Sequence, residues 1–81
     1  MFYFYVLKSS LDSKYYFGSS TDLRRRLIEH NSGKVKSTAT RLPLNLVYYE
    51  AYTTEELARK RESTVKRSGT ARDSIYKRIG A

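Results

Sequence analysis

The sequence predicts an α+β fold, in which a three-stranded antiparallel sheet with its first strand in the centre is flanked by helices. Residues 2–8 are a continuous apolar run, which is typical of a strand covered on both faces. The connection to a second strand at 15–19 is too short for a parallel crossover, so the two strands form a hairpin. Helical patterns follow this hairpin and also follow a third strand at 44–52. At 81 residues the chain forms one domain, residues 1–81, with a small core.

The hairpin and the first helix carry ordinary local signals. The connecting segment SSLDSK offers serine and aspartate side chains that can bond to nearby backbone. A helix is predicted over residues 22–31, where Thr21 or Asp22 can cap the start and Gly33 suits a left-handed end. Its apolar stripe is narrow and consists of Leu23, Leu27 and Ile28.

The middle of the chain predicts a loop, a strand and a second helix. Residues 34–43 are polar and basic without a helical period, which indicates a loop before the strand at 44–52. Thr53 and Glu56 have the spacing of a capping box that starts the second helix. One face of that helix is formed by Leu57, Ala58, Arg61, Glu62 and Val65.

The end of the chain predicts a short third helix. Ser68 and Gly69 break the preceding pattern, and Thr70 with Asp73 repeats the capping-box signal. The apolar residues of this last helix are Ile75, Tyr76 and Ile79.

Charge and cysteine content narrow the classes of function. Sixteen Lys and Arg against eight Asp and Glu give a formal net charge of +8, and such an excess on a small surface attracts polyanions. Nucleic acid is the expected partner, with a solubilising surface or association with the ribosome as alternatives. The chain has no cysteine, which excludes zinc fingers, disulfides and a cysteine nucleophile. The apolar opening MFYFYVL is too short to cross a membrane, so we expect a cytoplasmic protein without membrane contact.

Polar residues around the first helix could act on a phosphate. Arg26 and His30 are four residues apart and share one helix face, while Tyr16 and Gly18 end the strand that leads to this helix. Arginine could donate to the phosphate, histidine could accept a proton, and tyrosine could donate or accept one. A solvated basic helix with an incidental histidine explains the same residues, so these residues alone decide nothing.

Glu62 is an acidic residue without an obvious local duty. Most acids fall at helix starts or in a turn, whereas Glu62 lies mid-helix on the face that points to the core. A carboxylate there needs a partner, which could be a bound cation or an ion pair with Arg26 or Lys66. Glu50, near the end of the third strand, is a second candidate on the same argument.

Taken together, these residues resemble the GIY-YIG nuclease family, and the chain is similar to a small standalone member. The two halves of the name motif fall on Tyr3-Phe4-Tyr5 and on Tyr16-Phe17-Gly18. The segment GSSTDLRRRLIEHNSGK resembles the passage into the family's arginine helix. LVYYE resembles its third strand, and ARKRESTVK resembles the helix that presents its glutamate.

The resemblance implies a metal-dependent endonuclease that hydrolyses phosphodiester bonds in DNA, either structure-selective or working in DNA repair or recombination. It implies a structural role for the motif glycine, Gly18, and catalytic roles for Tyr5, Tyr16, Arg26, His30 and Glu62. Glu62 would bind one divalent cation, Mg²⁺ or Mn²⁺, and Arg26 would stabilise charge at the phosphorus. The other three would position or deprotonate water. The general base stays open among them, with a slight preference for His30, because free histidine has a pKa of ~6.5 and free tyrosine one of ~10.

Other residues have expected roles that do not involve catalysis. Basic residues predicted to contact the nucleic-acid backbone are Arg24, Arg25, Lys34, Lys36 and Arg41. Aromatic residues expected in the core, because a small domain needs their area, are Tyr15, Phe17, Tyr48, Tyr49 and Tyr52.

The sequence departs from the family pattern in two places. Tyr3 stands where the name has glycine, which is a common variation in standalone members, and residues 66–81 contain no asparagine where many relatives carry a late one. A non-catalytic nucleic-acid-binding module of the same fold is therefore the alternative to the nuclease, and a structural subunit is a third reading. Formation of a homodimer, or binding of a targeting partner protein, would determine which nucleic acid is recognised. DNA is favoured over RNA as the substrate.

Overall fold

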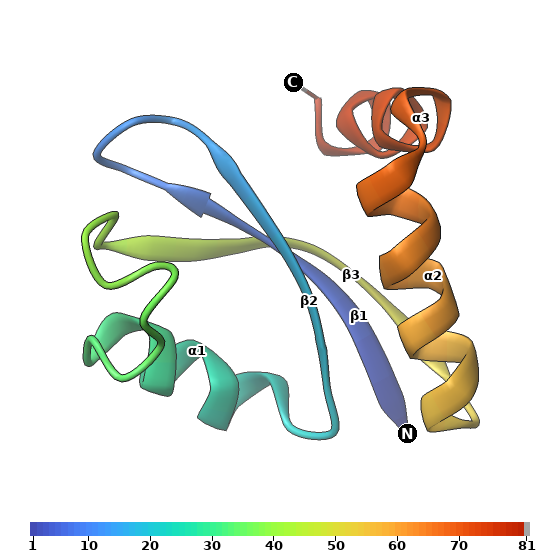
Figure 1. The fold of residues 1–81 in the computed structure, drawn as a ribbon, viewed down its shortest axis with the longest axis horizontal. Coiled ribbons are helices and arrows are strands. Elements are labelled where there is room, and N and C mark those ends of the chain that lie inside the picture. Colours follow the sequence, from blue (N-terminus) through green and yellow to red (C-terminus); the bar gives the residue numbers. More distant parts are fainter. Residues whose placement is uncertain (81) are drawn as a thin grey trace.

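The computed structural model describes residues 1–80 and confirms the predicted α+β architecture (Figure 1). The elements in chain order are β1 (Phe2–Ser9), β2 (Tyr15–Ser20), α1 (Leu23–Asn31), β3 (Leu44–Tyr52), α2 (Glu55–Arg67) and α3 (Gly69–Ile79). The strand order is β2-β1-β3, and both outer strands run antiparallel to β1. The continuous apolar sequence of β1 therefore corresponds to its central position.

Helix α1 lies on one side of the sheet, and α2 with α3 lies on the other (Figure 1). Because successive side chains of a strand point to opposite faces, β1 contributes to two cores. The core beneath α2 and α3 contains Phe4, Val6, Val65 and Ile75. The core beneath α1 contains Tyr5, Leu7 and Leu44, with Leu23 and Leu27 packed against them.

Helix α1 begins and ends close to its predicted limits. Asp22 caps it by accepting a hydrogen bond from the backbone N–H of Arg25 at 3.0 Å, and Gly33 follows the helix with a φ of 79°. The expectation that Ile28 belongs to the apolar stripe is wrong, because its exposed fraction is 63%. The contact between α1 and the sheet is therefore narrower than the sequence pattern indicated.

Helix α2 starts one residue later than the predicted capping box allows. The Thr54 hydroxyl, not that of Thr53, accepts from the backbone N–H of Leu57 at 3.2 Å. The Thr53–Glu56 box is therefore wrong, because α2 begins at Glu55, directly after Thr54. Leu57, predicted on the core-facing side, has an exposed fraction of 46%.

Helix α3 follows α2 after a single residue. Ser68 ends α2, and its side chain caps α3 by accepting from the backbone N–H of Ala71 at 3.2 Å. The predicted Thr70–Asp73 capping box is wrong because both residues already lie inside α3. Ile75 is fully buried, as expected for the apolar face of this helix.

The aromatic residues expected in the core divide by the face of the sheet on which they lie. Tyr15, Phe17, Tyr48 and Tyr52 are partly buried against the core beneath α2 and α3, as expected. Tyr49 does not fit this expectation, because it lies on the opposite face and has an exposed fraction of 54%. Its ring contacts Tyr3 edge-on, with 5.9 Å between centroids. Within residues 1–80, none of the helices combines the length and the apolar run needed to span a membrane.

Candidate active site

The site is organised around the hydroxyl of Tyr5 on the central strand. Tyr5 has an exposed fraction of 2%, and its oxygen lies 3.0 Å from Nε2 of His30. Nε of Arg26 donates to the same oxygen at 3.4 Å. Both partners come from α1, one turn apart, so the helical spacing seen in the sequence does bring Arg26 and His30 to one point.

The second ring nitrogen of His30 has a partner in the loop after α1. His30 is fully buried, and its Nδ1 lies 2.8 Å from Oγ1 of Thr38. The Thr38 hydroxyl donates to the carbonyl of Val35 at 3.3 Å, so its oxygen is available to accept. We therefore assign the histidine proton to Nδ1, which leaves Nε2 to accept from the Tyr5 hydroxyl. The result is a directed chain of hydrogen bonds from Arg26 through Tyr5 and His30 to Thr38.

Burial keeps Tyr5 and His30 in their neutral forms. Burial lowers the pKa of His30 below its ordinary value, and the positive charge of Arg26 lowers it further. Burial also raises the pKa of Tyr5, although the hydrogen bond from Arg26 acts in the opposite direction. At neutral pH the pair therefore consists of a neutral phenol donating to Nε2 of a neutral imidazole.

Tyr16 and Gly18 on β2 complete this group. The ring centroid of Tyr16 lies 5.0 Å from that of His30 and 6.4 Å from that of Tyr5. Gly18 pairs with Tyr5 across the strands, and a Cβ at Gly18 would lie 2.5 Å from the Tyr5 hydroxyl oxygen. The motif glycine is therefore needed because the Tyr5 ring lies directly over the backbone of β2.

Glu62 of α2 takes its hydrogen bonds from residues outside this group. Its Oε1 accepts from the Ser19 hydroxyl at 2.8 Å, and its Oε2 lies 2.6 Å from Nζ of Lys66. Of the two ion-pair alternatives, the pair with Lys66 is thus the one that forms, while Arg26 pairs with Glu29 at 3.2 Å. The Glu62 side chain is 22% exposed and lines an open groove of about 560 Å³.

The two parts of the site approach β2 from opposite faces of the sheet. Gly18 is in register with Tyr5, and the next residue, Ser19, is in register with Phe4 of the other core. Ser19 therefore points to the α2 side, where it meets Glu62. The parts are still electrostatically coupled, because the negative charge of Glu62 adds to the raised pKa of Tyr5 after the larger effect of burial. The site thus bends around the edge strand at residues 18–19.

The donor groups near Glu62 suit a cation that keeps most of its own water. No group of three or more His, Cys, Asp or Glu residues comes together among residues 1–80. Mg²⁺ is commonly bound through one or two carboxylates, with waters and substrate phosphates as the other ligands. Glu62 with the neighbouring Ser19 hydroxyl fits such a site, provided that the Lys66 ammonium moves away from Oε2.

Glu50, the second carboxylate considered for a cation, is fully engaged by protein groups. Its oxygens accept from the hydroxyls of Tyr48 and Tyr52 and from the guanidinium of Arg61, at 2.5 to 3.2 Å. Burial acts to raise the pKa of Glu50, but these hydrogen bonds lower it overall. Burial and the bond to Glu50 raise the pKa of Tyr52 to about 12. This cluster has a structural role in joining β3 to α2.

The basic residues predicted to contact phosphates differ in whether their side chains are exposed or held by other residues. Arg24, Arg25, Lys34 and Lys36 are exposed on α1 and the following loop. Arg41 is held inward, with Nε 3.4 Å from Oδ2 of Asp12 and Nη2 donating to the carbonyl of Tyr15 at 3.4 Å. Arg41 therefore ties the loop to the hairpin, and a phosphate contact from it stays a prediction.

Three residues of the site were not identified from the sequence. Glu29 follows Arg26 by three positions, and this helical spacing was a usable signal for the ion pair. Ser19 and Thr38 had no such signal, because their partners are distant in sequence and are set by the path of the chain.

Comparison with known proteins agrees with this fold. A family model for the GIY-YIG catalytic domain matches residues 1–79. The chain belongs to the GIY-YIG family. Among its relatives is a UPF0213 protein of Streptococcus pneumoniae serotype 4, 47% identical over 80% of this chain and 66% of that protein. Another is a UPF0213 protein of Listeria innocua, 44% identical over 91% of this chain and 82% of that protein. The chain thus spans just under two thirds of the length of the streptococcal relative.

A solved structure extends the similarity to three dimensions. The solution NMR structure of the UPF0213 protein BH0048 from Bacillus halodurans is 35% identical to this chain, with a TM-score of 0.58. The match covers 95% of this chain and 84% of that one. The family and the fold predicted from the sequence are therefore confirmed, and the GIY-YIG domain places the chain in a superfamily that generally consists of nucleases.

Proposed function

We propose that this protein is a divalent-metal-dependent endonuclease that hydrolyses phosphodiester bonds in DNA. The directed chain of hydrogen bonds through Arg26, Tyr5, His30 and Thr38 carries this proposal. Burying a tyrosine hydroxyl between a cation and a neutral histidine costs desolvation free energy, which a surface that only binds phosphates does not need to spend. The same arrangement suits proton transfer. Repair or recombination intermediates are the proposed substrates.

The structure favours Tyr5 over His30 as the group that removes the proton from water. His30 is fully buried and both of its ring nitrogens have partners, so water does not reach it directly. The Tyr5 oxygen takes the water proton while its own proton passes to Nε2 of His30, which leaves neutral Tyr5, imidazolium and hydroxide. The hydroxide attacks phosphorus, and the leaving oxygen departs with the electron pair of the broken P–O bond and takes a proton from solvent. His30 then returns its proton to solvent through the Tyr5 oxygen, which restores the starting state.

Arg26 controls access to the Tyr5 oxygen in this proposal. Its side chain is 35% exposed and its Nε covers the Tyr5 hydroxyl. A substrate phosphate attracts the guanidinium more strongly than a neutral phenol does, so binding draws Arg26 away from Tyr5 and opens the oxygen to water. Arg26 then stabilises the negative charge that develops at phosphorus. Tyr16, partly exposed beside His30, would orient the water.

Glu62, together with Ser19, would hold the divalent cation. When bound, that cation supplies positive charge to the scissile phosphate and the leaving oxygen. The single carboxylate predicts weak binding in the absence of nucleic acid, because phosphate oxygens complete the ligand set.

The direct test is cleavage of branched, nicked and single-stranded DNA by purified protein with Mg²⁺ or Mn²⁺. We expect Glu62→Gln to lower cleavage by about 10²-fold or more, since it removes the anionic ligand while keeping the side-chain shape. Glu56→Gln is the matched control, because Glu56 is exposed in the first turn of the same helix. The proposal fails if the wild type cleaves none of these substrates, or if Glu62→Gln and Glu56→Gln cleave equally well.

The second candidate is a nucleic-acid-binding module without catalysis. The position of the Lys66 ammonium on Glu62 favours it, because that ammonium stands where a cation would bind. This alternative predicts salt-sensitive DNA binding that does not change with Mg²⁺ or with Glu62→Gln. A cytoplasmic location, and a homodimer or a targeting partner protein, stay predictions under either function.

A further inference from the structure

A basic groove runs along the exposed side of α2, away from the phosphate contacts predicted from the sequence. It measures about 560 Å³ and is lined by Ser19, Arg59, Glu62, Ser63, Lys66 and Arg67. Three of these side chains are cationic and one is a carboxylate, so the groove carries a net positive charge. The basic residues proposed earlier lie on α1 and its loop, on the other side of the sheet.

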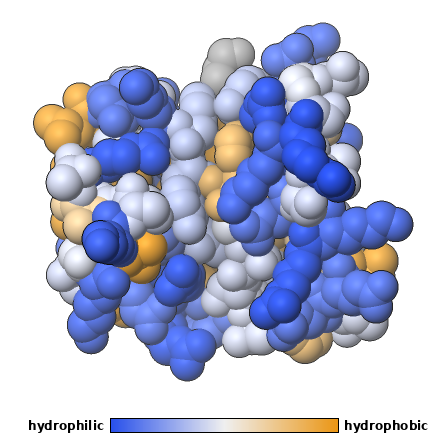
Figure 2. Space-filling view, in the orientation of Figure 1, coloured by the Kyte–Doolittle hydropathy of each residue, from blue (hydrophilic) through white to orange (hydrophobic). Residues whose placement is uncertain are grey.

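The helical spacing of the lining residues makes the groove a continuous stripe. Positions 59, 63, 66 and 67 recur at intervals that keep them on one face of a helix. Arg59 and Arg67 are separated by about 12 Å along the axis, at 1.5 Å per residue. Figure 2, drawn in the same orientation as Figure 1, shows hydrophilic side chains gathered over α2 on the visible face of the molecule. A stripe of this length matches between three and four steps of one strand of a duplex, at about 3.4 Å of rise along the duplex axis per step.

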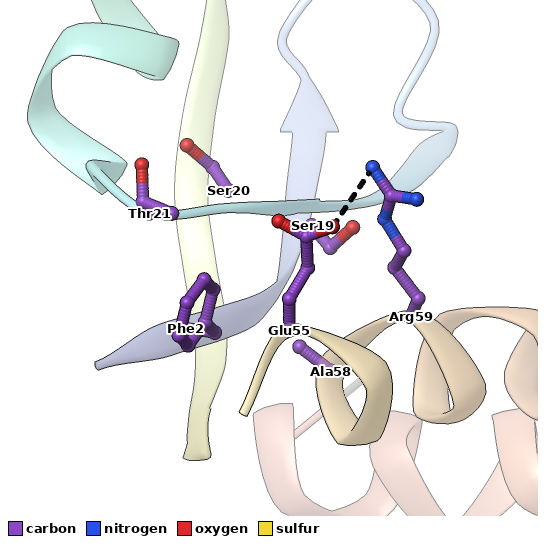
Figure 3. A pocket seen from close by; sticks show the side chains of 7 residues that line it. All are labelled: Phe2, Ser19, Ser20, Thr21, Glu55, Ala58 and Arg59. Carbon is purple, nitrogen blue, oxygen red and sulfur yellow. Dashed lines mark ion pairs between the residues drawn. The ribbon is translucent and has the colours of Figure 1, made fainter. Parts of the chain in front are cut away.

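The cationic side chains of this stripe can bind a ligand with little loss of folding stability. Arg59 is 71% exposed, and its ion pair with Glu55 at 3.2 Å is a surface pair, which contributes little to stability. Figure 3 shows this pair beside a smaller pocket of about 120 Å³, which shares Ser19 and Arg59 with the groove. Arg67 bonds through Nε to the carbonyl of Ser63 at 3.3 Å, which leaves its terminal nitrogens for another acceptor.

We propose that this groove binds the phosphate backbone of the nucleic acid next to the bond that is cleaved. The inference rests on the proposed function, since it extends the same site along α2. Arg59 and Arg67 contact phosphates at the two ends of the groove. Lys66 leaves Glu62 for a phosphate between them, which frees the carboxylate for its cation. The backbone is thereby held on both faces of the edge strand β2, by α1 on one side and by α2 on the other.

Binding is tested separately from cleavage by measuring affinity in EDTA. The probe is a fluorescently labelled DNA duplex of about 20 base pairs, and its anisotropy is followed over a range of salt concentrations. We expect the double variant Arg59→Gln/Arg67→Gln to raise Kd by about tenfold or more near 0.1 M salt. The slope of the logarithm of the binding constant against the logarithm of the salt concentration should become smaller in magnitude by about 1.8, because two phosphate contacts are lost. The charge-retaining variant Arg59→Lys/Arg67→Lys should keep most of the affinity.

The matched control is Lys60→Gln/Lys77→Gln, which removes the same two charges from exposed positions outside the groove. We expect it to raise Kd by less than about threefold, since only the long-range field changes. The proposal is overturned if both double variants weaken binding equally, or if neither does. A wild type that binds through Arg59 and Arg67 but does not cleave overturns the proposed function alone. A wild type that cleaves, with the groove variant matching the control in binding, overturns the groove alone.

Discussion

The substitution Gly18→Ala tests the packing on which the site depends. A Cβ at Gly18 would lie 2.5 Å from the Tyr5 hydroxyl oxygen and 2.6 Å from its Cζ, which no unstrained structure tolerates. Tyr5 cannot retreat easily, since it is 2% exposed and bonded to His30 and Arg26. Overpacking of this kind costs about 1–3 kcal/mol. In a domain of this size 1 kcal/mol corresponds to about 4–8 °C, so Tm should fall by about 4–24 °C.

Activity should fall further than stability does, because the added methyl group moves the Tyr5 oxygen away from Nε2 of His30. We expect at least about tenfold slower cleavage at a temperature where the variant is still folded. Thermal unfolding followed by circular dichroism measures the first effect, and single-turnover cleavage of DNA measures the second. The control is Gly69→Ala at the start of α3, where a Cβ would meet nothing closer than Nη2 of Arg72 at 3.7 Å. That variant should keep or slightly raise Tm. An unchanged Tm and unchanged cleavage in Gly18→Ala would refute the placement of the Tyr5 ring over β2.

Further predictions concern the buried pair and the carboxylate. Thr38→Val should release the Nδ1 proton of His30 from its acceptor and change the tautomer seen in ¹⁵N NMR spectra, whereas Thr38→Ser should preserve it; identical spectra for both would contradict the assigned chain. Because burial holds the pKa of His30 below ~6.5, its contribution to stability is full above that pH and declines as the pH falls towards the folded-state value. Urea unfolding between about pH 7.5 and 5.5 should therefore show a loss of stability that His30→Gln removes, and an equal slope in the variant would count against it. Lys66→Met should tighten Mn²⁺ binding measured by electron paramagnetic resonance, since Nζ no longer competes at 2.6 Å from Glu62; unchanged or weaker binding would contradict a cation at this carboxylate.

Much of the fold could be predicted because its signals are local. The continuous apolar run of β1 indicated a strand with cover on both faces, and the sheet places it between β2 and β3. Helix starts were less predictable, because neighbouring polar residues are chemically equivalent as caps. Thr54 rather than Thr53 caps α2, although the end of β3 at Tyr52 was predicted correctly. Exposure of Ile28 and Tyr49 was also missed, since it depends on how much of the sheet α1 covers.

The residues of the candidate site also divide into those that could be predicted from the sequence and those that depend on the tertiary structure. Helical spacing alone placed Arg26 and His30 together, and the family resemblance added Tyr5 and Glu62. Thr38 could not be found, because it lies in a loop without periodic pattern and meets His30 only through the tertiary path of the chain. The complete burial of His30 could not be predicted either, since an isolated sequence does not reveal which ring nitrogens are already bonded. The preference for His30 as the base stays a prediction from the sequence, and the proposed function assigns that role to Tyr5.

The arrangement around β2 separates two physical requirements of phosphodiester hydrolysis. Proton transfer from water benefits from a dry, fully hydrogen-bonded pair, which Tyr5 and His30 form beneath α1. Charge neutralisation needs an open surface where a hydrated cation and a long polyanion can enter, and the groove beside Glu62 is open on α2. A phosphate that contacts both parts has to cross the edge of β2 at residues 18–19. Glycine followed by serine is the least bulky pair of residues in that strand, so the crossing point coincides with the place where a substrate backbone can approach most closely.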